Sequence, residues 1–264
     1  PVFLLLVLSI QWSFSQKYSN EFLSIGLSAR AQAMGNSFVA SVDDVTAGFW
    51  NPAALASIDM SKGIQIGAKH AEWFGGVGKY DYLGLAIPFD DHKRAFGVSM
   101  IRFGIDDIPN TLSLYEDDGS VNYDNIKPFS AADYAFLFSY AQKVHTDRGE
   151  LFLGGNVKVV HRSIGPFAKS WGFGLDASVK YHLGKWKFGA LLKDISNTFN
   201  AWSFNFTEDE KVILDLTDNT IPIKSLEVTR PQIILAAARK FDFGKVGLTA
   251  ELDMNMFMDG KRNT

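Results

Sequence analysis

From residue 62 onward, apolar and polar side chains alternate with a period of two, over segments that are long for a soluble sheet. In residues 171–183, WGFGLDASVKYHL, large apolar residues alternate with glycine, aspartate, serine and lysine. Successive side chains of a strand point to opposite faces, so this pattern predicts strands. Each predicted strand has about 10–14 residues, and alternating segments of about ten residues are typical of transmembrane β-barrels. The roughly nine predicted strands span residues 63–73, 79–89, 94–103, 131–143, 151–163, 171–183, 186–194, 230–241 and 245–257.

The polar face of these predicted strands is made of small residues. It carries glycine, serine, alanine, asparagine, aspartate and lysine, whereas the outer face of a soluble sandwich is rich in lysine, glutamate and threonine. Such a face suits a crowded lumen better than a solvated exterior, although glycine also marks tight bends in soluble barrels. We therefore expect the polar face to look inward and the apolar face to look toward lipid.

The predicted connections alternate between short turns and mostly longer loops. This asymmetry is typical of outer-membrane barrels, whose short turns lie in the periplasm. Aromatic residues also collect near the strand ends, as an interface girdle or ordinary edge packing would both produce. The short turns are 90–93, 145–149, 183–186 and 241–245, the longer loops are 72–78, 105–130, 165–170 and 196–228, and the aromatic residues are Trp73, Phe74, Tyr80, Phe89, Trp171, Trp186, Phe241 and Phe243.

Composition and the first residues narrow the class further. The formal charge of −3 gives no basic face for nucleic acid, and the absence of cysteine removes disulfides, thiolate metal sites and thiol nucleophiles. Residues 1–16, PVFLLLVLSIQWSFSQ, contain an apolar core too short to span a bilayer but of the length found in signal peptides. A first buried strand is the alternative. We predict a partial signal peptide, and hence export.

The odd strand number predicts that the chain is a piece of a longer protein. Bacterial single-chain barrels have an even number of strands, with both termini on the periplasmic side. An open edge in lipid would leave unpaired backbone groups, at several kcal/mol each. We therefore expect truncation at both ends and several further strands. The predicted organisation is a partial signal peptide over 1–16, an N-terminal hatch or plug over 17–61, and a C-terminally truncated barrel over 62–264.

Residues 17–61 break the alternation and predict short helices. Ser28 and Gly35 are the usual cap residues at the two ends of one helical piece. Asp43 and Asp44 stand where a helix N-terminus favours negative charge. In NPAALAS, Asn51 is a predicted N-cap and Pro52 occupies the first helical position. Two interpretations stay open: loop helices that cover one end of a barrel, or a plug whose small residues pack closely inside a narrow lumen.

The run ARAQAMGNSFVASVDDVTAGFWNPAALA, residues 29–56, resembles the N-terminal signature of the PorV/PorQ family of outer-membrane proteins from Bacteroidota. That family is similar to the FadL-type fatty-acid channels, which carry a comparable Asn-Pro-Ala element in their hatch. The resemblance implies an all-β fold, a FadL-like transmembrane antiparallel β-barrel of about fourteen strands with about nine present here, and a hatch in or beneath the lumen. The motif residues are Gly35, Asp43, Asp44, Trp50, Asn51, Pro52 and Ala53.

The same resemblance implies a role and partners. Family members include the shuttle of the type IX secretion system, which passes cargo proteins from an outer-membrane translocon to a sortase complex at the cell surface. The implied partners are therefore membrane lipid, a translocon, a sortase-type protein and secreted cargo, and the implied location is the outer membrane. A FadL-like channel for hydrophobic small molecules such as fatty acids is the alternative. A barrel with hydrolase activity is a third hypothesis, against which the missing serine–histidine arrangement argues.

Motifs for chemistry are weak, and we expect no enzymatic activity, no cofactor and no metal site. The five histidines fall singly, without metal spacing. Residues 116–120, EDDGS, resemble either a calcium loop or a solvated acidic loop. Loop 196–228 mixes acidic and apolar residues, which favours protein binding. Five charges on the polar face either line a path or form structural ion pairs: Lys158, Arg162, Asp176, Lys180 and Lys193.

Overall fold

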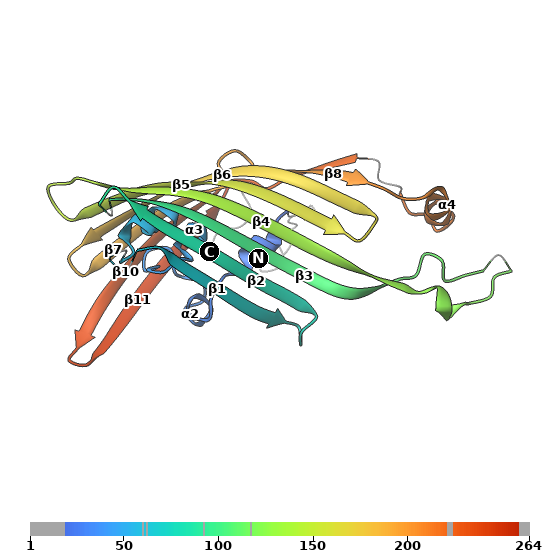
Figure 1. The fold of residues 1–264 in the computed structure, drawn as a ribbon, viewed down its shortest axis with the longest axis horizontal. Coiled ribbons are helices and arrows are strands. Elements are labelled where there is room, and N and C mark those ends of the chain that lie inside the picture. The colour runs from blue at the N-terminus through green and yellow to red at the C-terminus, as the bar shows by residue number, and fades with distance from the viewer. Residues whose placement is uncertain are drawn as a thin grey trace, which may run out of the picture.

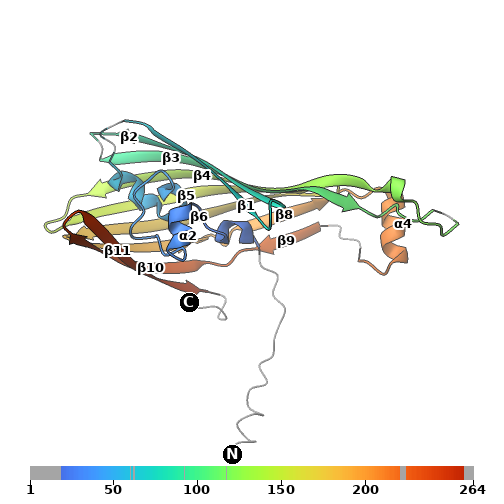
Figure 2. The ribbon, with the colours of Figure 1, turned by 90° about the horizontal axis from the view of Figure 1, so that it is seen from below.

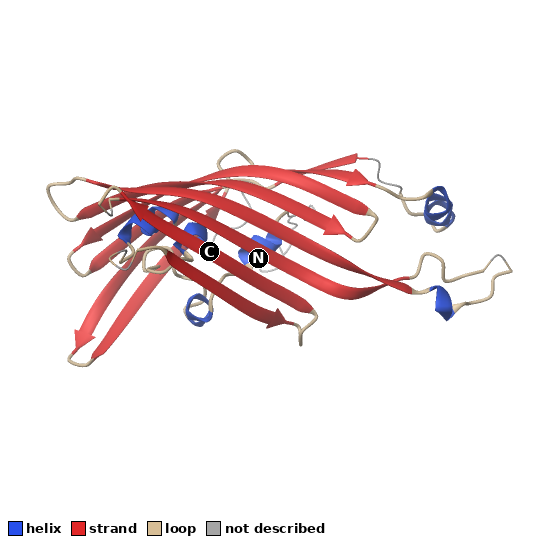
Figure 3. Cartoon of the chain, in the orientation of Figure 1, coloured by secondary structure: helices blue, strands red, loops and turns tan. Residues whose placement is uncertain are grey.

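The computed structural model describes residues 19–59, 61, 63–91, 93–116, 118–220 and 224–258. The predicted signal peptide lies outside these described residues. The all-β prediction is confirmed, because one antiparallel sheet makes up most of the chain (Figures 1 and 3). Its strands are β1 (Gln65–Trp73), β2 (Gly78–Phe89), β3 (Arg94–Asn110), β4 (Lys127–Val144), β5 (Glu150–Ile164), β6 (Ala168–Leu183), β7 (Trp186–Lys193), β8 (Phe199–Phe204), β9 (Lys224–Val228), β10 (Gln232–Phe243) and β11 (Val246–Phe257).

All nine predicted strands are present, and two more, β8 and β9, lie in the predicted loop 196–228. These two extend existing columns of the sheet. β6 pairs with β7 along its C-terminal half and with β8 along its N-terminal half, while β10 pairs with β7 and β9 with β8. The break between β7 and β8 contains two residues with positive φ, Asp194 at 58° and Asn197 at 55°. Eleven strands therefore occupy nine columns.

The sheet is curved but not closed within the described residues. Its order runs from β1 through β7 to β10 and β11, and the two edge strands pair only with β2 and β10 respectively. Figure 2 shows the sheet curving around the N-terminal segment, which we define as residues 19–59. We call the sheet face that contacts this segment the inner face, and the opposite face the outer face. Closure into a barrel stays a prediction.

The two faces have the polarity that the alternation predicts, which is the reverse of a soluble sheet. On β6, Trp171 and Leu175 are 53% and 46% exposed on the outer face, whereas Asp176 and Lys180 on the inner face are 7% and 1% exposed. The same outward exposure of large apolar side chains recurs at Phe96, Val98, Phe138, Val157, Phe173, Val179, Leu235 and Leu252. In the described part of the chain, no helix has the length and apolar character that a membrane crossing requires.

The hydrophobic core lies between the N-terminal segment and the inner face. It joins Phe38, Trp50 and Leu55 from that segment to Tyr82 and Ile101 from the sheet. The N-terminal segment contains four short helices: η1 (Glu21–Ser24), α2 (Ala29–Ala33), α3 (Ala47–Trp50) and η2 (Pro52–Ser57). Two predicted girdle residues are misplaced. Tyr80 points inward, is buried, and donates to the Phe22 carbonyl at 3.0 Å, and Trp73 packs against this core.

At the other end, β3 and β4 continue past the predicted strands into a long hairpin (Figure 1). A helix that the sequence analysis missed, α4 (Glu208–Leu216), lies beside the tip of this hairpin in Figures 1 and 2, and the hairpin tip contains the short helix η3 (Tyr123–Asn125). We call the region formed by the hairpin tip and α4 the loop end. The opposite end carries the short turns between β2 and β3, β4 and β5, β6 and β7, and β10 and β11.

Candidate functional site

The N-terminal segment is held by inner-face side chains that bond to its backbone. Most of the segment has no regular structure, so its buried N–H and C=O groups need partners from elsewhere. Six inner-face residues of strands β2, β5, β6 and β7 supply such partners. Tyr80 donates to Phe22 O (3.0 Å), Tyr82 to Val45 O (2.7 Å), Lys180 to Val42 O (2.6 Å), Asn156 to Gly48 O (2.8 Å) and Lys193 to Leu23 O (3.3 Å), while Ser178 Oγ accepts from Ala53 N (2.8 Å). The polar side chains of the inner face therefore replace the hydrogen bonds that regular secondary structure would give this backbone.

The inner-face glycines allow the segment to approach closely. A Cβ at Gly154 would lie 2.6 Å from the Cα of Ala53, and one at Gly97 would lie 2.8 Å from a methyl carbon of Leu55. Both distances are far below normal van der Waals contact, so a larger residue would displace η2 from the sheet. The predicted reason for the small residues, close packing of a helical piece against the strands, is therefore visible in the structure.

Lys158 lies at the centre of a buried charge cluster. Its Nζ is 3.1 Å from Asp176 Oδ1 and 2.6 Å from Asp194 Oδ1, and its side chain is 1% exposed. Asp194 also accepts from the Thr198 hydroxyl at 2.5 Å, and its backbone N–H donates to Asp176 at 2.8 Å. Buried charges are stable only when paired and hydrogen-bonded, and this cluster meets both conditions. It fixes the break between β7 and β8 against β5 and β6.

The other charges of the predicted set have different partners. Arg162 binds Asp133 through two hydrogen bonds, of 2.8 and 3.2 Å, and reaches Glu227 at 3.3 Å. Lys180 and Lys193 bond to the backbone carbonyls of the N-terminal segment. Among the described residues, neither forms an ion pair within 4 Å. Mutual pairing within the predicted set is thus limited to Lys158 and Asp176.

Part of the hatch motif acts as predicted. Ser28 caps α2 by accepting from Ala31 N, and Gly35 follows this helix with a φ of 64°, a conformation that favours glycine. Asp44 accepts from the backbone N–H and the hydroxyl of Thr46, the N-cap residue of α3. Asp43 differs from the prediction, because it pairs with Arg30 at 2.7 Å.

The Trp-Asn-Pro-Ala run is the centre of the contact. Trp50 donates its indole N–H to Leu27 O at 3.2 Å, and Pro52 takes the first position of η2 as predicted. Asn51 holds the predicted N-cap position of η2, but its side chain makes no capping hydrogen bond. Its amide donates instead to Val39 O at 2.9 Å and to Val179 O at 3.4 Å, because the side chain is fully buried against the sheet. Ala53, the last residue of the run, donates its backbone N–H to the hydroxyl of Ser178.

Two carboxylates that the sequence analysis did not single out hold the middle of the N-terminal segment. Asp253 accepts from the backbone N–H groups of Phe38 (3.1 Å) and Val39 (3.4 Å). Glu251 accepts from those of Ala40 (2.6 Å) and Ser41 (3.3 Å). Both come from the inner face of β11. Their signal was a pair of acidic residues two positions apart in a strand, on the face predicted to be small and polar.

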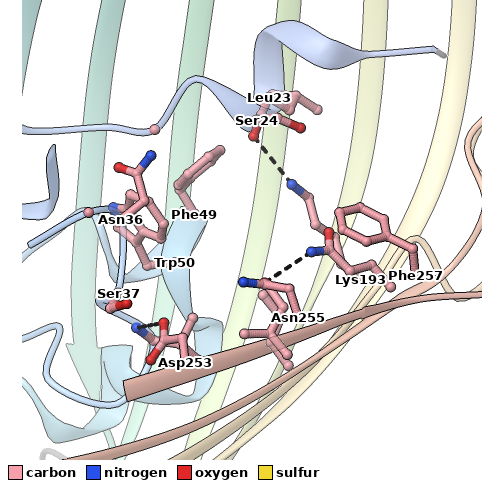
Figure 4. A pocket seen from close by; sticks show the side chains of 16 residues that line it. Leu23, Ser24, Asn36, Ser37, Phe49, Trp50, Lys193, Asp253, Asn255 and Phe257 are labelled. Atoms are coloured by element: carbon pink, nitrogen blue, oxygen red, sulfur yellow. Dashed lines mark hydrogen bonds between the residues drawn. The ribbon is translucent and has the colours of Figure 1, made fainter. Parts of the chain in front are cut away.

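A cavity of about 210 Å³ lies between the N-terminal segment and strands β7, β10 and β11 (Figure 4). Its wall combines aromatic rings with polar groups. Phe49 and Trp50 come from the N-terminal segment, and Lys193, Asp253 and Phe257 come from the sheet. Lys193 also lies 5.6 Å from the centre of the Phe49 ring, a cation–π contact. The cavity is a mixed polar and aromatic space rather than an apolar tunnel.

A second cavity, of about 340 Å³, lies at the loop end, and we call it the loop-end cavity. Its wall is almost entirely apolar. Leu112 comes from the hairpin formed by β3 and β4, Leu214 from α4, and four phenylalanines from strand ends and turns. Phe129 and Phe167 meet edge to face at 5.1 Å, and Phe206 stacks on Phe167 at 5.8 Å. The lining residues are Pro109, Asn110, Thr111, Leu112, Phe129, Ile164, Phe167, Ala168, Phe204, Phe206 and Leu214.

The acidic turn EDDGS is braced from within the hairpin tip. The Glu116 carboxylate accepts from the side-chain amides of Asn122 (2.7 Å) and Asn125 (3.0 Å). These hydrogen bonds, that from Asn122 first, hold the pKa of Glu116 below its ordinary value of 4.5. Across the residues with described positions, histidine, aspartate and glutamate side chains do not gather in groups of three that could hold a metal ion.

Comparison with known proteins gave no relative: neither the protein-family models nor the curated protein sequences contain a match to this chain.

Proposed function

We propose that this chain forms part of the wall, together with the plug, of an outer-membrane β-barrel. Its role would be non-enzymatic, in protein secretion or in the attachment of proteins at the cell surface. The observation that carries the membrane assignment is the reversed polarity of the sheet. Large apolar side chains cover the outer face, and buried charges occupy the inner face. Exposed apolar side chains lower the free energy of a protein in lipid and raise it in water.

The secretion role is supported by the filled inner face of the sheet and by the positions of the two cavities. The N-terminal segment occupies the inner face through many specific bonds, and the cavity beside it is small and partly polar. The larger apolar cavity lies at the loop end, where a passing protein would meet it. The resemblance of residues 29–56 to the PorV/PorQ signature agrees with this role and with an outer-membrane location.

Uptake of hydrophobic small molecules is the second candidate, favoured by one observation. In the cavity of Figure 4, Lys193 stands among Phe49, Trp50 and Phe257, a combination that could accept a carboxylate with an apolar tail. The two roles differ in what the protein carries. When the protein is purified from its native membrane, protein partners co-purify with a secretion component, whereas a fatty acid co-purifies with an uptake channel. Mass spectrometry of the purified material separates them, and a fatty acid without protein partners contradicts the first role.

The membrane assignment is tested by placing a charge on the outer face. Val157→Arg lies midway along β5, and we expect it to lower the free energy of unfolding in phosphatidylcholine vesicles by about 2–4 kcal/mol. Ser163→Arg is the matched control, because it lies on the same face of the same strand near the loop end. There the cost should fall to about 0–1 kcal/mol. If the outer face is normally in water, both variants stay within about 0.5 kcal/mol of the parent chain, which contradicts the proposal.

A further inference from the structure

The loop end carries a charge far from that of the rest of the chain. Residues 104–126 and 205–220 contain eleven acidic residues and one basic residue, a net charge of −10. The whole chain has a net charge of −3, so the remaining residues sum to +7. Two of these carboxylates are neutralised locally, since Asp106 pairs with Lys79 at 2.8 Å and Glu208 with Lys211 at 2.6 Å. The negative potential is therefore concentrated at one end of the molecule.

The loop-end cavity opens within this acidic region. The hairpin that contributes Leu112 also carries Glu116 and Asp118, and the helix that contributes Leu214 also carries Asp215. Large apolar side chains stand exposed on the same two elements, among them Tyr115, Tyr123, Val212 and Leu216. An apolar depression with an acidic surround and exposed aromatic residues has the composition of a protein-binding surface.

We propose that the loop-end cavity is a docking site for a positively charged polypeptide segment that inserts a large apolar side chain between Leu112 and Leu214. This inference rests on the proposed function, because a cell-surface protein is the partner that this end would meet. Charge complementarity selects the occupant. A fatty acid or an anionic lipid would fit the apolar wall but would be repelled by the surrounding carboxylates, and nucleic acid would be repelled as well.

The arrangement assigns separate tasks to the two kinds of residue. The carboxylates of the loop end steer the partner and make association depend on salt, because exposed charges act over about 8–10 Å and are screened beyond that. The apolar wall supplies the short-range contact, in which one buried anchor side chain carries most of the affinity. Removing a wall residue should therefore speed dissociation, and removing carboxylates of the loop end should slow association.

The test uses a fluorescein-labelled peptide in which Trp-Leu-Phe is flanked on each side by three lysines. Binding to the refolded full chain is followed by fluorescence anisotropy. The chain is held in phosphatidylcholine nanodiscs, or in free solution if it does not insert. We expect Leu214→Ser to weaken binding at least tenfold. Leu216→Ser is the matched control on the same helix. It should change binding less than twofold, because Leu216 is 79% exposed and lies outside the cavity wall.

Further variants keep the test decisive if Leu214→Ser disturbs α4. Leu112→Ser, on the opposite wall, should also weaken binding at least tenfold. Asp215→Asn together with Asp118→Asn should weaken binding and flatten its dependence on salt. A peptide with glutamate in place of lysine should not bind. Equal binding of the acidic peptide, or equal effects of Leu214→Ser and Leu216→Ser, overturns the proposal.

The outcomes separate this inference from the proposed function. If peptide binding behaves as expected but Val157→Arg shows no cost in vesicles, the docking site stands and the membrane wall fails. If the vesicle result holds and the peptide distinguishes none of the variants, the docking site alone fails.

Discussion

At the scale of single residues, Lys158 has the most demanding environment described for this chain. Its charge is almost fully removed from water and is shared between two carboxylates on different parts of the sheet. Removing one partner of a buried pair normally costs more than the pair contributes, because a charge is left uncompensated. The three residues are therefore not equivalent, since one cation serves two anions.

This asymmetry predicts unequal mutational effects. Lys158→Met leaves Asp176 and Asp194 facing each other without a cation, and we expect a loss of about 3–5 kcal/mol in the free energy of unfolding. Asp194→Asn should cost only about 1–2 kcal/mol, because Asp176 still pairs with Lys158 and the amide oxygen still accepts from Thr198. Denaturant titrations followed by tryptophan fluorescence measure both. Equal losses would show that Lys158 does not bridge the two carboxylates.

For single residues, the sequence predicted the roles that depend on neighbouring residues and not those that depend on residues far along the chain. Ser28, Gly35 and Pro52 were assigned correctly, because caps and first-turn prolines depend on neighbouring residues. Asn51 holds the predicted N-cap position, but its side chain does not cap the helix, because contacts with Val39 and with Val179, 128 residues away, override the local preference. The partners of Arg162 could not be inferred either, since Asp133 and Glu227 come from other columns of the sheet.

At the scale of elements, β11 does two tasks with its two faces. The outer face exposes Leu248, Leu252 and Met254, and the inner face presents Glu251 and Asp253 to four successive backbone N–H groups. Hydrogen bonds to charged acceptors are about twice as strong as neutral ones. An edge strand thereby fastens the middle of the N-terminal segment.

We expect the double variant Glu251→Gln and Asp253→Asn to loosen this attachment. The amides keep an accepting oxygen but lose the charge, so the bonds weaken and residues 38–41 open more often. Hydrogen exchange measured by mass spectrometry should show at least tenfold faster exchange in these residues. Thr249→Val, on the same face of β11, is the control and should leave their exchange unchanged. Unchanged exchange in the double variant would mean that other contacts hold the segment.

The sequence predicted long elements better than short ones. All nine strands with sustained alternation were found, whereas β8, β9 and α4 were missed inside a predicted loop. β8 and β9 have only six and five residues, too few for a clear period. For α4 a signal did exist: Thr207 and Glu210 form a capping box immediately before the apolar run VIL. This signal was not used, because the mixture of acidic and apolar residues in 196–228 favoured a loop.

At the scale of the whole molecule, the antiparallel order places the two long connections, β3 to β4 and β7 to β10, at one end, while short turns lie at both ends, because the predicted loops 72–78 and 165–170 shrink to the turns 74–77 and 165–167. The placement of the long connections and the reversed polarity were both predictable from the sequence, because each depends only on alternation and spacing. Closure into a barrel was not determined in the same way, since it requires β1 and β11 to find partners, and these two strands form the edges of the described sheet.

The proposed orientation predicts which end reaches the medium. The chain has no cysteine, so a single introduced thiol reports on one position. In the native membrane, Ser113→Cys in the hairpin tip should react with a membrane-impermeant maleimide on intact cells. Asp147→Cys, in the turn between β4 and β5, should react only after lysis. Labelling of Asp147→Cys on intact cells would contradict the proposed orientation.

The way in which the N-terminal segment is held also fixes the order in which the molecule can be completed. Its residues leave the ribosome first, yet the acceptors for Phe38 and Ala40 are 215 and 211 residues further along the chain. Contacts of such sequence separation form late, because the intervening chain must first be ordered. Residues 38–41 are therefore synthesised before the strands but fastened last, because their acceptors are supplied only when β11 is in place.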